Sequence, residues 1–420
     1  MLDGECSHIL EIEWFDSHVT SLSPARVRLA ILALAIGGFG IGSTEFVAMG
    51  LLPNIAHDLL PTLFAKSQEA ANAQAGWLVS AYALGVVVGA PTIATFAARF
   101  PRKKLLLVLV AAFTLGSVAS ALLPTFGLVL AARFLAGLPH GAYFGVAALV
   151  AAQLMGPGKR GKGVAMVLTG LTIANIVGVP SITFLGQQTS WRVAYLVVAA
   201  IFAVTFLSIA WLVPHLPGDP GATMRRELKA FRRIQVWLAL LIGAVGFGGF
   251  FAVYTYISPV VTEITRLGHG FVPIVLVVVG VGMTVGNLLG GWSADRNVMG
   301  SIFAYFGLFA IALTAFALSA HTVVGLLISA FLIGLASAAL SPSIQTRLMD
   351  VAGESQTIAA AVNHAALNLG NSLGAVLGGV TIAAGLGYLA PTWTGLILCL
   401  PGVALALTSL LLQRRRPLIP

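Results

Sequence analysis

Twelve continuous apolar stretches, each about twenty residues long, follow one another along the chain. A helix of that length crosses the hydrocarbon core of a bilayer, whereas the strands of a membrane barrel would alternate apolar and polar residues. The pattern therefore predicts an all-α membrane protein. Its twelve transmembrane helices are expected at 27–52, 75–97, 104–124, 127–154, 162–187, 192–213, 236–260, 272–294, 300–319, 322–346, 357–383 and 391–412.

The polar segments between these stretches divide the chain into two similar halves. The segment 214–235, rich in Pro, Gly and basic residues, has six apolar stretches on each side. We expect a polar N-terminal tail at 1–24, a six-helix bundle at 25–213, and a cytoplasmic loop at 214–235. A second six-helix bundle is expected at 236–413, followed by a basic tail at 414–420.

A weak internal repeat indicates that the second half is a duplicate of the first. A shift of 197 residues places Gly85 on Gly282, and a shift of 196 places Asn175 on Asn371. An even number of spans per half means that the repeats are parallel and related by an axis along the membrane normal. The predicted architecture is therefore two pseudo-symmetric bundles with a binding cavity between them near mid-membrane.

Composition excludes an ordinary soluble domain. The chain is 58% hydrophobic and only 9% charged, with a mean hydropathy of +0.97. A soluble domain carries about a quarter charged residues, so this chain cannot cover a water-facing surface of ordinary size. The two cysteines, Cys6 and Cys399, are too far apart in sequence and setting to indicate a disulfide framework or a metal site.

The basic residues are concentrated in alternate loops and at both ends of the chain. Nineteen of the 23 Lys and Arg residues follow this pattern, three lie in the intervening loops, and Arg133 lies inside a span. The nineteen are Arg26, Arg28, Arg99, Arg102, Lys103, Lys104, Lys159, Arg160, Lys162, Arg225, Arg226, Lys229, Arg232, Arg233, Arg296, Arg347, Arg414, Arg415 and Arg416, and the three are Lys66, Arg192 and Arg266. Because Lys and Arg are retained on the cytoplasmic side, both termini are expected in the cytoplasm. The net charge of +9 thus reflects membrane topology and anionic lipid rather than a nucleic-acid partner.

Residues 1–24 do not resemble a secretory signal. They contain five acidic residues and no Lys or Arg, which is the wrong charge for the start of a signal peptide. We expect a disordered tail, or a start of translation that has been placed too far upstream.

Glu45 is the most informative residue of the chain. It lies in the first span, in the sequence GGFGIGSTEFVAMG of residues 37–50. A carboxylate inside a membrane is costly and normally faces a polar cavity or takes up a proton. Burial favours the protonated form and a nearby cation the ionised form, so Glu45 is a candidate proton carrier. A carboxylate held by a structural hydrogen bond is the alternative.

Arg133 is the one basic residue well inside a span, and His140 follows it by two helical turns. Arginine stays charged within a protein and needs a carboxylate, backbone carbonyls or water. Histidine titrates near neutral pH, so a cluster of Arg133, His140 and Glu45 could relay protons. Alternatively, Arg133 ties helix ends together through carbonyls, and His140 is a packing residue.

The eleventh and seventh spans supply candidate side chains for a substrate cavity. Amides in a membrane helix either join helices or line a cavity, and aromatic rings can form an apolar binding wall. Packing or lipid contact remains an alternative for the aromatic residues. The candidates are Asn363, His364, Asn368, Asn371, Phe251 and Tyr254.

Small residues at four-residue spacing occur in several spans. Gly170 and Gly178 belong to such a stripe in the fifth span, and Pro180 is expected to weaken or kink that helix. Close helix packing explains the stripes, although sliding helices also need such surfaces.

No cluster of residues indicates an enzyme. The sequence contains no phosphate-binding loop and no zinc-protease signature. We therefore expect no catalytic activity, no cofactor and no metal, and no ATP-driven pumping by this chain.

The segment 43–53, with the sequence STEFVAMGLLP, resembles the first-span signature of a known family. The family is the twelve-span drug:proton antiporter family of the major facilitator superfamily, in its branch of bacterial arabinose or sugar efflux permeases and amphenicol exporters. The resemblance covers residues 25–413. Arg133 with Gly137 and Gly141 resembles the fourth-span motif, whose arginine the family assigns to proton coupling.

Two further motifs of the family are present in incomplete form. The loop motif stands as Gly291-x-x-x-Asp295-Arg296 in the second half, while the first half keeps Arg99 and Arg102 but has Ala98 in place of the acid. In the fifth-span antiporter motif Gly170, Gly178 and Pro180 are present, but Val179 separates the usual Gly-Pro pair. The resemblance implies that these residues take part in the conformational change.

The resemblance and the intramembrane charges together favour one function. We expect a monomeric inner-membrane transporter that exports a small sugar-like or drug-like solute in exchange for protons by alternating access. A uniporter or importer of sugars or nucleosides is the alternative within transport. A membrane receptor or enzyme is a different class, and it would need a signalling domain or a clustered nucleophile.

Overall fold

The computed structural model of the chain describes residues 23–97, 100–156, 160–217, 233–352 and 356–415. The described residues contain twelve helices long and apolar enough to cross a membrane, as predicted from the sequence. The helices are α2 (Pro24–Gly50), α3 (Leu52–Leu59), α4 (Pro61–Lys66), α5 (Gln68–Ala75), α6 (Trp77–Ala97), α7 (Arg102–Leu122), α8 (Phe126–Gly137), α9 (Pro139–Met155), α10 (Arg160–Ile173), the π-helix η1 (Ala174–Gly178), α11 (Val179–Gln188), α12 (Trp191–Leu212), α14 (Ile234–Tyr254), α15 (Ile257–Pro259), the π-helix η3 (Val260–Ile264), the 3-10 helix η4 (His269–Phe271), α16 (Val272–Ala294), α17 (Val298–Ser319), α18 (Val323–Ala352), α19 (Gln356–Ala383) and α20 (Ala390–Arg415).

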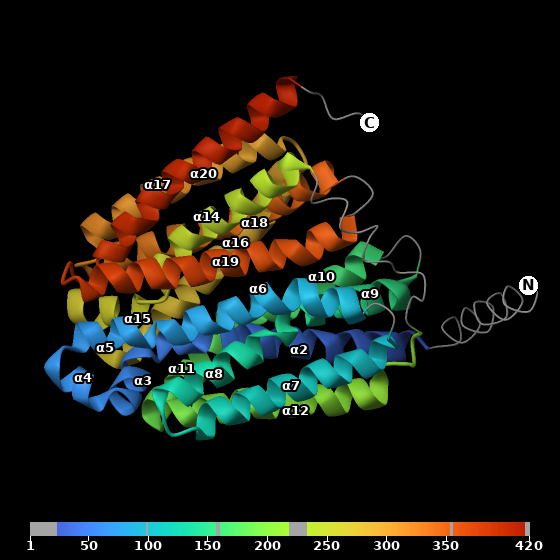
Figure 1. Cartoon of the computed structure of the whole chain (residues 1–420), viewed down its shortest axis with the longest axis horizontal. Coiled ribbons are helices and arrows are strands. Elements are labelled where there is room, and N and C mark those ends of the chain that lie inside the picture. The colour runs from blue at the N-terminus through green and yellow to red at the C-terminus, as the bar shows by residue number, and fades with distance from the viewer. Residues whose placement is uncertain (1–22, 98–99, 157–159, 218–232, 353–355, 416–420) are drawn as a thin grey trace, which may run out of the picture.

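The helices form two bundles that lie side by side (Figure 1). The first bundle runs from α2 to α12 and the second from α14 to α20. They meet where α6 packs against α19 and where η1 and α11 pack against α16. The start of α2 and the end of α20 lie at the same end of the molecule, here called the terminal end. The opposite, distal end carries α3, α4, α5 and α15.

The duplication predicted from the sequence is visible in the helix contacts. A Cβ atom on Gly85 would lie 2.1 Å from the carbonyl oxygen of Phe134, and one on Gly282 would lie 2.3 Å from that of Phe331. Gly282 and Phe331 lie 197 residues after Gly85 and Phe134, respectively. The contact between Gly89 and Leu138 is likewise repeated 197 residues later, between Gly286 and Leu335. The two halves therefore share one packing scheme.

These contacts predict which glycines tolerate a methyl group. A Cβ on Gly89 would meet the carbonyl oxygen of Leu138 at 2.0 Å, whereas one on Gly145 would meet nothing within 4 Å. Gly89→Ala is expected to lower the stability by about 1–3 kcal/mol, because a backbone atom must move. Gly145→Ala, the matched control, is expected to be neutral or stabilising because alanine favours helix. Thermal unfolding in detergent measures both, and equal melting temperatures would contradict the packing.

The surface of the bundles is apolar, as contact with lipid requires. Large aliphatic and aromatic side chains are exposed on several spans, among them Leu115, Trp211, Leu288 and Leu400 at 70% or more of their area. In water such a surface would drive aggregation, whereas in a bilayer it contacts acyl chains. The described residues therefore form a multi-pass membrane protein.

The placement of Arg347 in a loop was wrong. The helix α18 continues past residue 346 to Ala352, and Arg347 lies inside it with 2% of its area exposed. Its guanidinium donates to Gln413 Oε1 at 2.9 Å, to Gln235 Oε1 at 3.0 Å and to Ser409 Oγ at 2.9 Å. These neutral acceptors satisfy the charge in part, which allows the helix to bury it near the terminal end.

The fifth span is distorted just before Pro180, as predicted from the sequence. Residues Ala174–Gly178 form the π-helix η1, directly before α11, whose second residue is Pro180. Proline has no N–H to donate to the preceding turn, so the hydrogen-bond pattern is disturbed there.

The N-terminal tail to residue 22, Arg99 and residues 218–232 of the central loop lie outside the described residues.

Candidate functional site

Glu45 lies at the boundary between the two bundles. It belongs to the second half of α2 and exposes 6% of its area. The side-chain amide of Asn371, on α19 of the other bundle, donates to Glu45 Oε1 at 3.1 Å. The buried carboxylate of one half therefore binds the other half directly.

Arg133 lies next to Glu45 but does not form an ion pair with it. It is 1% exposed on α8, and its Nη1 donates to Thr44 Oγ1 at 3.1 Å. The described residues contain one ion pair within 4.0 Å, between Arg192 and Asp58 at the distal end. Thr44, the residue before Glu45, thus connects the guanidinium to the segment that carries the carboxylate.

Two tyrosine rings form the remaining walls around Arg133. Its guanidinium carbon lies 4.3 Å from the ring centre of Tyr82 and 5.3 Å from that of Tyr195. Such contacts stabilise a desolvated cation through the electron-rich ring face. In the described part of the chain, Nε and Nη2 of Arg133 have no hydrogen-bond partner. These two donors form one edge of the guanidinium, which matches the geometry of a carboxylate.

His140 meets this site through Tyr82 rather than through Arg133 or Glu45. Its Nδ1 lies 3.1 Å from the hydroxyl oxygen of Tyr82. On its other side it faces His364 of α19, with 6.3 Å between the ring centroids. His364 in turn stacks on Phe144 at 5.4 Å and 7°. The predicted cluster of arginine, histidine and glutamate is therefore linked through a tyrosine and a threonine.

Tyr82 offers a way to separate its two contacts. Tyr82→Phe keeps the ring next to Arg133 and loses only the hydroxyl contact to His140, so we expect a loss of stability of about 1 kcal/mol. Tyr82→Leu also removes the ring from the guanidinium, which is expected to cost about 1–2 kcal/mol more. Thermal unfolding of the two purified variants tests this order. Equal losses would mean that the ring face does not stabilise Arg133.

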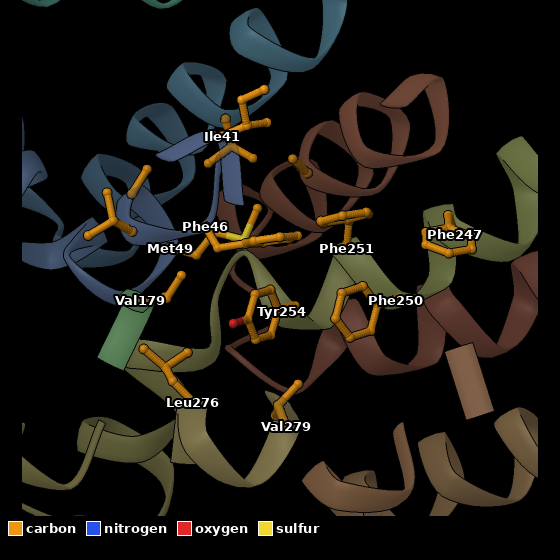
Figure 2. Packing of buried hydrophobic residues seen from close by; sticks show 14 of the residues in the cluster. Ile41, Phe46, Met49, Val179, Phe247, Phe250, Phe251, Tyr254, Leu276 and Val279 are labelled. Carbon is orange, nitrogen blue, oxygen red and sulfur yellow. The ribbon is translucent and has the colours of Figure 1, made fainter. Parts of the chain in front are cut away.

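Aromatic side chains from both bundles pack together at Phe46, the residue after Glu45 (Figure 2). Phe46 of α2 stacks on Phe251 of α14 with ring centroids 6.0 Å apart and 3° between the planes. Tyr254 meets the edge of Phe46 at 5.7 Å and stacks on Phe250 at 4.9 Å. The predicted cavity residues Phe251 and Tyr254 therefore pack across the boundary between the halves. Phe46, which they contact, was missed from the sequence.

The three asparagines of α19 are buried and only partly satisfied. Asn363, Asn368 and Asn371 expose 2%, 5% and 1% of their area. Asn368 donates to the backbone carbonyl of His364 at 3.0 Å. Within the described residues, the side-chain oxygen of each of the three asparagines has no donor. Buried polar atoms without partners are uncommon, and they give this helix acceptors for a polar molecule.

The glycines of the fifth span serve close packing on α2. A Cβ on Gly170 would meet the carbonyl oxygen of Ala35, and one on Gly178 would meet Phe39 at 2.7 Å and Ser43 at 2.9 Å. This stripe places α10 and η1 directly against the helix that carries Glu45. The structure therefore favours a packing role for these residues at the site.

The residues of the loop motif lie at helix ends near the terminal end. The Nη1 of Arg296 donates to the carbonyl oxygen of Trp292 at 2.8 Å, and its guanidinium lies 3.8 Å from the ring centre of Trp292. The backbone N–H of Asp295 donates to the carbonyl oxygen of Gly291 at 3.2 Å. The backbone N–H of Arg102 donates to the carbonyl oxygen of Leu216 at 2.9 Å.

The two bundles are joined at the distal end. Asn72 donates to the hydroxyl oxygen of Tyr388 at 2.8 Å, and Ser80 donates to the carbonyl oxygen of Ser372 at 3.3 Å. Burial raises the pKa of Tyr388 to about 12. The phenol therefore keeps its proton at physiological pH, and this contact does not change with pH there.

Comparisons with known proteins agree with this architecture. The sequence model of the Major Facilitator Superfamily matches residues 34–325 and 274–420. The chain is 41% identical over 363 residues to the inner membrane transport protein YdhP of Escherichia coli K12, covering 86% of this chain and 91% of that protein. It is 33% identical over 365 residues to the putative transporter AraJ of the same organism, covering 86% and 90%. It is 32% identical over 369 residues to a chloramphenicol resistance protein of Streptomyces lividans, covering 87% and 92%.

Solved structures share the fold at much lower identity. The D-xylose-proton symporter superposes with a TM-score of 0.71 at 16% identity, covering 91% of this chain and 97% of that one. The human organic anion transporter MFSD10 (TETRAN) superposes with a TM-score of 0.68 at 15% identity, covering 92% and 100%. At this identity the likeness concerns the fold alone. The fold, the family match and the relatives lead to the same conclusion: the chain is a membrane transporter of the Major Facilitator Superfamily.

Proposed function

We propose that this transporter exports a small organic solute, sugar-like or drug-like, in exchange for protons. One observation carries the proposal: the buried carboxylate of Glu45 lies between the two halves and is bound by Asn371 of the opposite half. An intramembrane carboxylate at a moving boundary can take up a proton on one side and release it on the other. The relative named as a chloramphenicol resistance protein favours export.

We assign the residues of the site to proton binding, to electrostatic control of the proton, and to solute binding. Glu45 would bind and release the proton, while the fixed charge of Arg133 would favour the ionised carboxylate when the two approach. Phe251 and Tyr254 would form the apolar wall of a solute site, and the free amide oxygens of Asn363 and Asn368 would accept hydrogen bonds from hydroxyl groups.

Alternating access requires that the halves move relative to one another. We propose that residues 25–213 and 236–413 rock as two units joined by residues 214–235, and that one chain is sufficient because all the named residues belong to it. The basic residues at the terminal end favour a cytoplasmic location for both termini. The distal end, closed by the bond between Asn72 and Tyr388, would then face away from the cytoplasm.

Proton movement driven by a solute tests the proposal. Purified protein is reconstituted into liposomes with a pH-sensitive dye inside, and chloramphenicol or arabinose is added outside without a pH gradient. We expect at least one of these solutes, or a related one from a panel of amphenicols and pentoses, to move protons in the opposite direction. Uptake of a radiolabelled solute with no proton movement would instead indicate a uniporter, and proton movement in the same direction an importer.

A further inference from the structure

Among the described side chains of α19, Asn371 is the amide that binds a carboxylate of the other half. Three side-chain hydrogen bonds join the halves in the described residues, from Asn72 to Tyr388, from Ser80 to the carbonyl of Ser372, and from Asn371 to Glu45. Of these, the bond to Glu45 is the one whose acceptor can gain or lose a proton within the membrane.

The strength of this bond depends on the protonation of its acceptor. An N–H donor binds an ionised carboxylate about twice as strongly as a neutral acceptor. When Glu45 is ionised, Asn371 therefore holds the two halves together next to the closed distal end. When Glu45 is protonated, the same contact weakens and the halves separate more easily there.

Other charged and titratable groups near Glu45 come from helices other than α19. They are Arg133 on α8, Tyr82 on α6 and Tyr254 on α14. On α19 itself, His364 precedes Asn371 by two turns and contacts Phe144 and His140 rather than Glu45. The link from the carboxylate to the second bundle through α19 therefore runs through Asn371.

We propose that Asn371 is a latch that keeps the empty, deprotonated transporter closed at its distal end. This inference rests on the proposed proton antiport. An antiporter must not change conformation when it carries neither proton nor solute, because Glu45 would then take a proton from the distal side and release it on the other side. Such cycling would dissipate the proton gradient without transport. The ionised carboxylate itself closes the latch in this empty state, and protonation or a bound solute opens it.

The latch predicts a proton leak that needs no solute. In liposomes with an imposed pH gradient and no solute, Asn371→Ala is expected to dissipate the gradient about tenfold faster than the wild type, since it loses a charge-assisted hydrogen bond. Asn371→Leu keeps the approximate size of the side chain and removes the N–H donor, so it is expected to leak as well. An internal pH dye records both rates.

Two further variants separate the latch from simple damage. Asn175 occupies the position equivalent to Asn371 in the first half, is also buried, and packs against α16. In the described residues, Glu45 accepts its side-chain amide hydrogen bond from Asn371 and not from Asn175. Asn175→Ala is therefore the matched control and is expected not to leak. The double variant Glu45→Gln with Asn371→Ala is expected not to leak either, because it lacks the proton carrier.

Exposure of the distal interface gives a second readout. Ala73 lies at this interface, where its carbonyl oxygen is 3.2 Å from a Cβ placed on Gly379. In a variant with Cys6 and Cys399 replaced by serine, Ala73→Cys is expected to react faster with a membrane-impermeant maleimide when Asn371→Ala is also present. Unchanged labelling would contradict the latch.

The failure of the latch and the failure of proton antiport are distinguishable. A folded Asn371→Ala protein that does not leak overturns the latch, and so does a leak that persists in the double variant. Either result leaves solute-driven proton movement by the wild type intact. Proton antiport itself fails only if the wild type moves solute without protons.

Discussion

Replacing Glu45 by glutamine is expected to reduce proton-driven transport to the level of liposomes without protein. Glutamine has nearly the same shape, and its carbonyl oxygen can still accept the hydrogen bond from Asn371. The variant should therefore fold normally, but its side chain cannot bind and release a proton. The expected defect is loss of coupling rather than loss of structure.

Solute exchange provides the control for this variant. A transporter whose carboxylate is replaced by a neutral amide can still carry solute in both directions, because that part of the cycle needs no proton. We expect Glu45→Gln to equilibrate labelled solute between two compartments while failing to concentrate it against a gradient. Full accumulation driven by the proton gradient would exclude Glu45 as the carrier.

Replacing Arg133 by methionine is expected to abolish coupling without lowering the stability. The guanidinium is buried with two nitrogen atoms that have no partner among the described residues, and it forms no direct ion pair there. A buried charge that is imperfectly paired costs free energy, and an apolar residue of similar volume often removes this cost. The melting temperature of Arg133→Met is therefore expected to equal or exceed that of the wild type.

The loss of coupling in this variant follows from the position of the charge. Arg133 supplies the fixed positive charge next to Glu45, held by Thr44 and by the ring of Tyr82. Without it the carboxylate retains its proton more strongly and does not release it toward the terminal end. Arg133→Lys keeps the charge but loses the planar group that contacts the two rings, so an intermediate rate is expected. Full proton-driven transport by Arg133→Met would remove Arg133 from the mechanism.

Much of this site could be predicted from the sequence, because charged residues inside apolar stretches are conspicuous. Glu45 and Arg133 were identified from the cost of burying a charge in a membrane, and the structure brings them to adjacent positions. Their neighbours Thr44, Tyr82 and Tyr195 were missed. Threonine and tyrosine are unremarkable in a membrane helix, and their roles depend on which helices pack together.

The helix boundaries could likewise be predicted where they depend on local sequence, but not where they depend on contacts between helices. The distortion before Pro180 was predictable, since proline removes a backbone donor wherever it stands. Arg347 was placed in a loop because a charge usually ends a span. Its acceptors Gln235, Ser409 and Gln413 come from two other helices, and no local pattern indicates that they meet there.

Infrared spectroscopy of the reconstituted protein tests most directly whether Glu45 carries the proton. Difference spectra between acidic and alkaline pH record the carbonyl stretch of a protonated carboxylic acid, and they need no solute. We predict a band of a buried carboxylic acid that disappears reversibly as the pH rises in the wild type and is absent from Glu45→Gln. A band that titrates identically in the two proteins would show that another group binds the proton, and the mechanism built on Glu45 would be wrong.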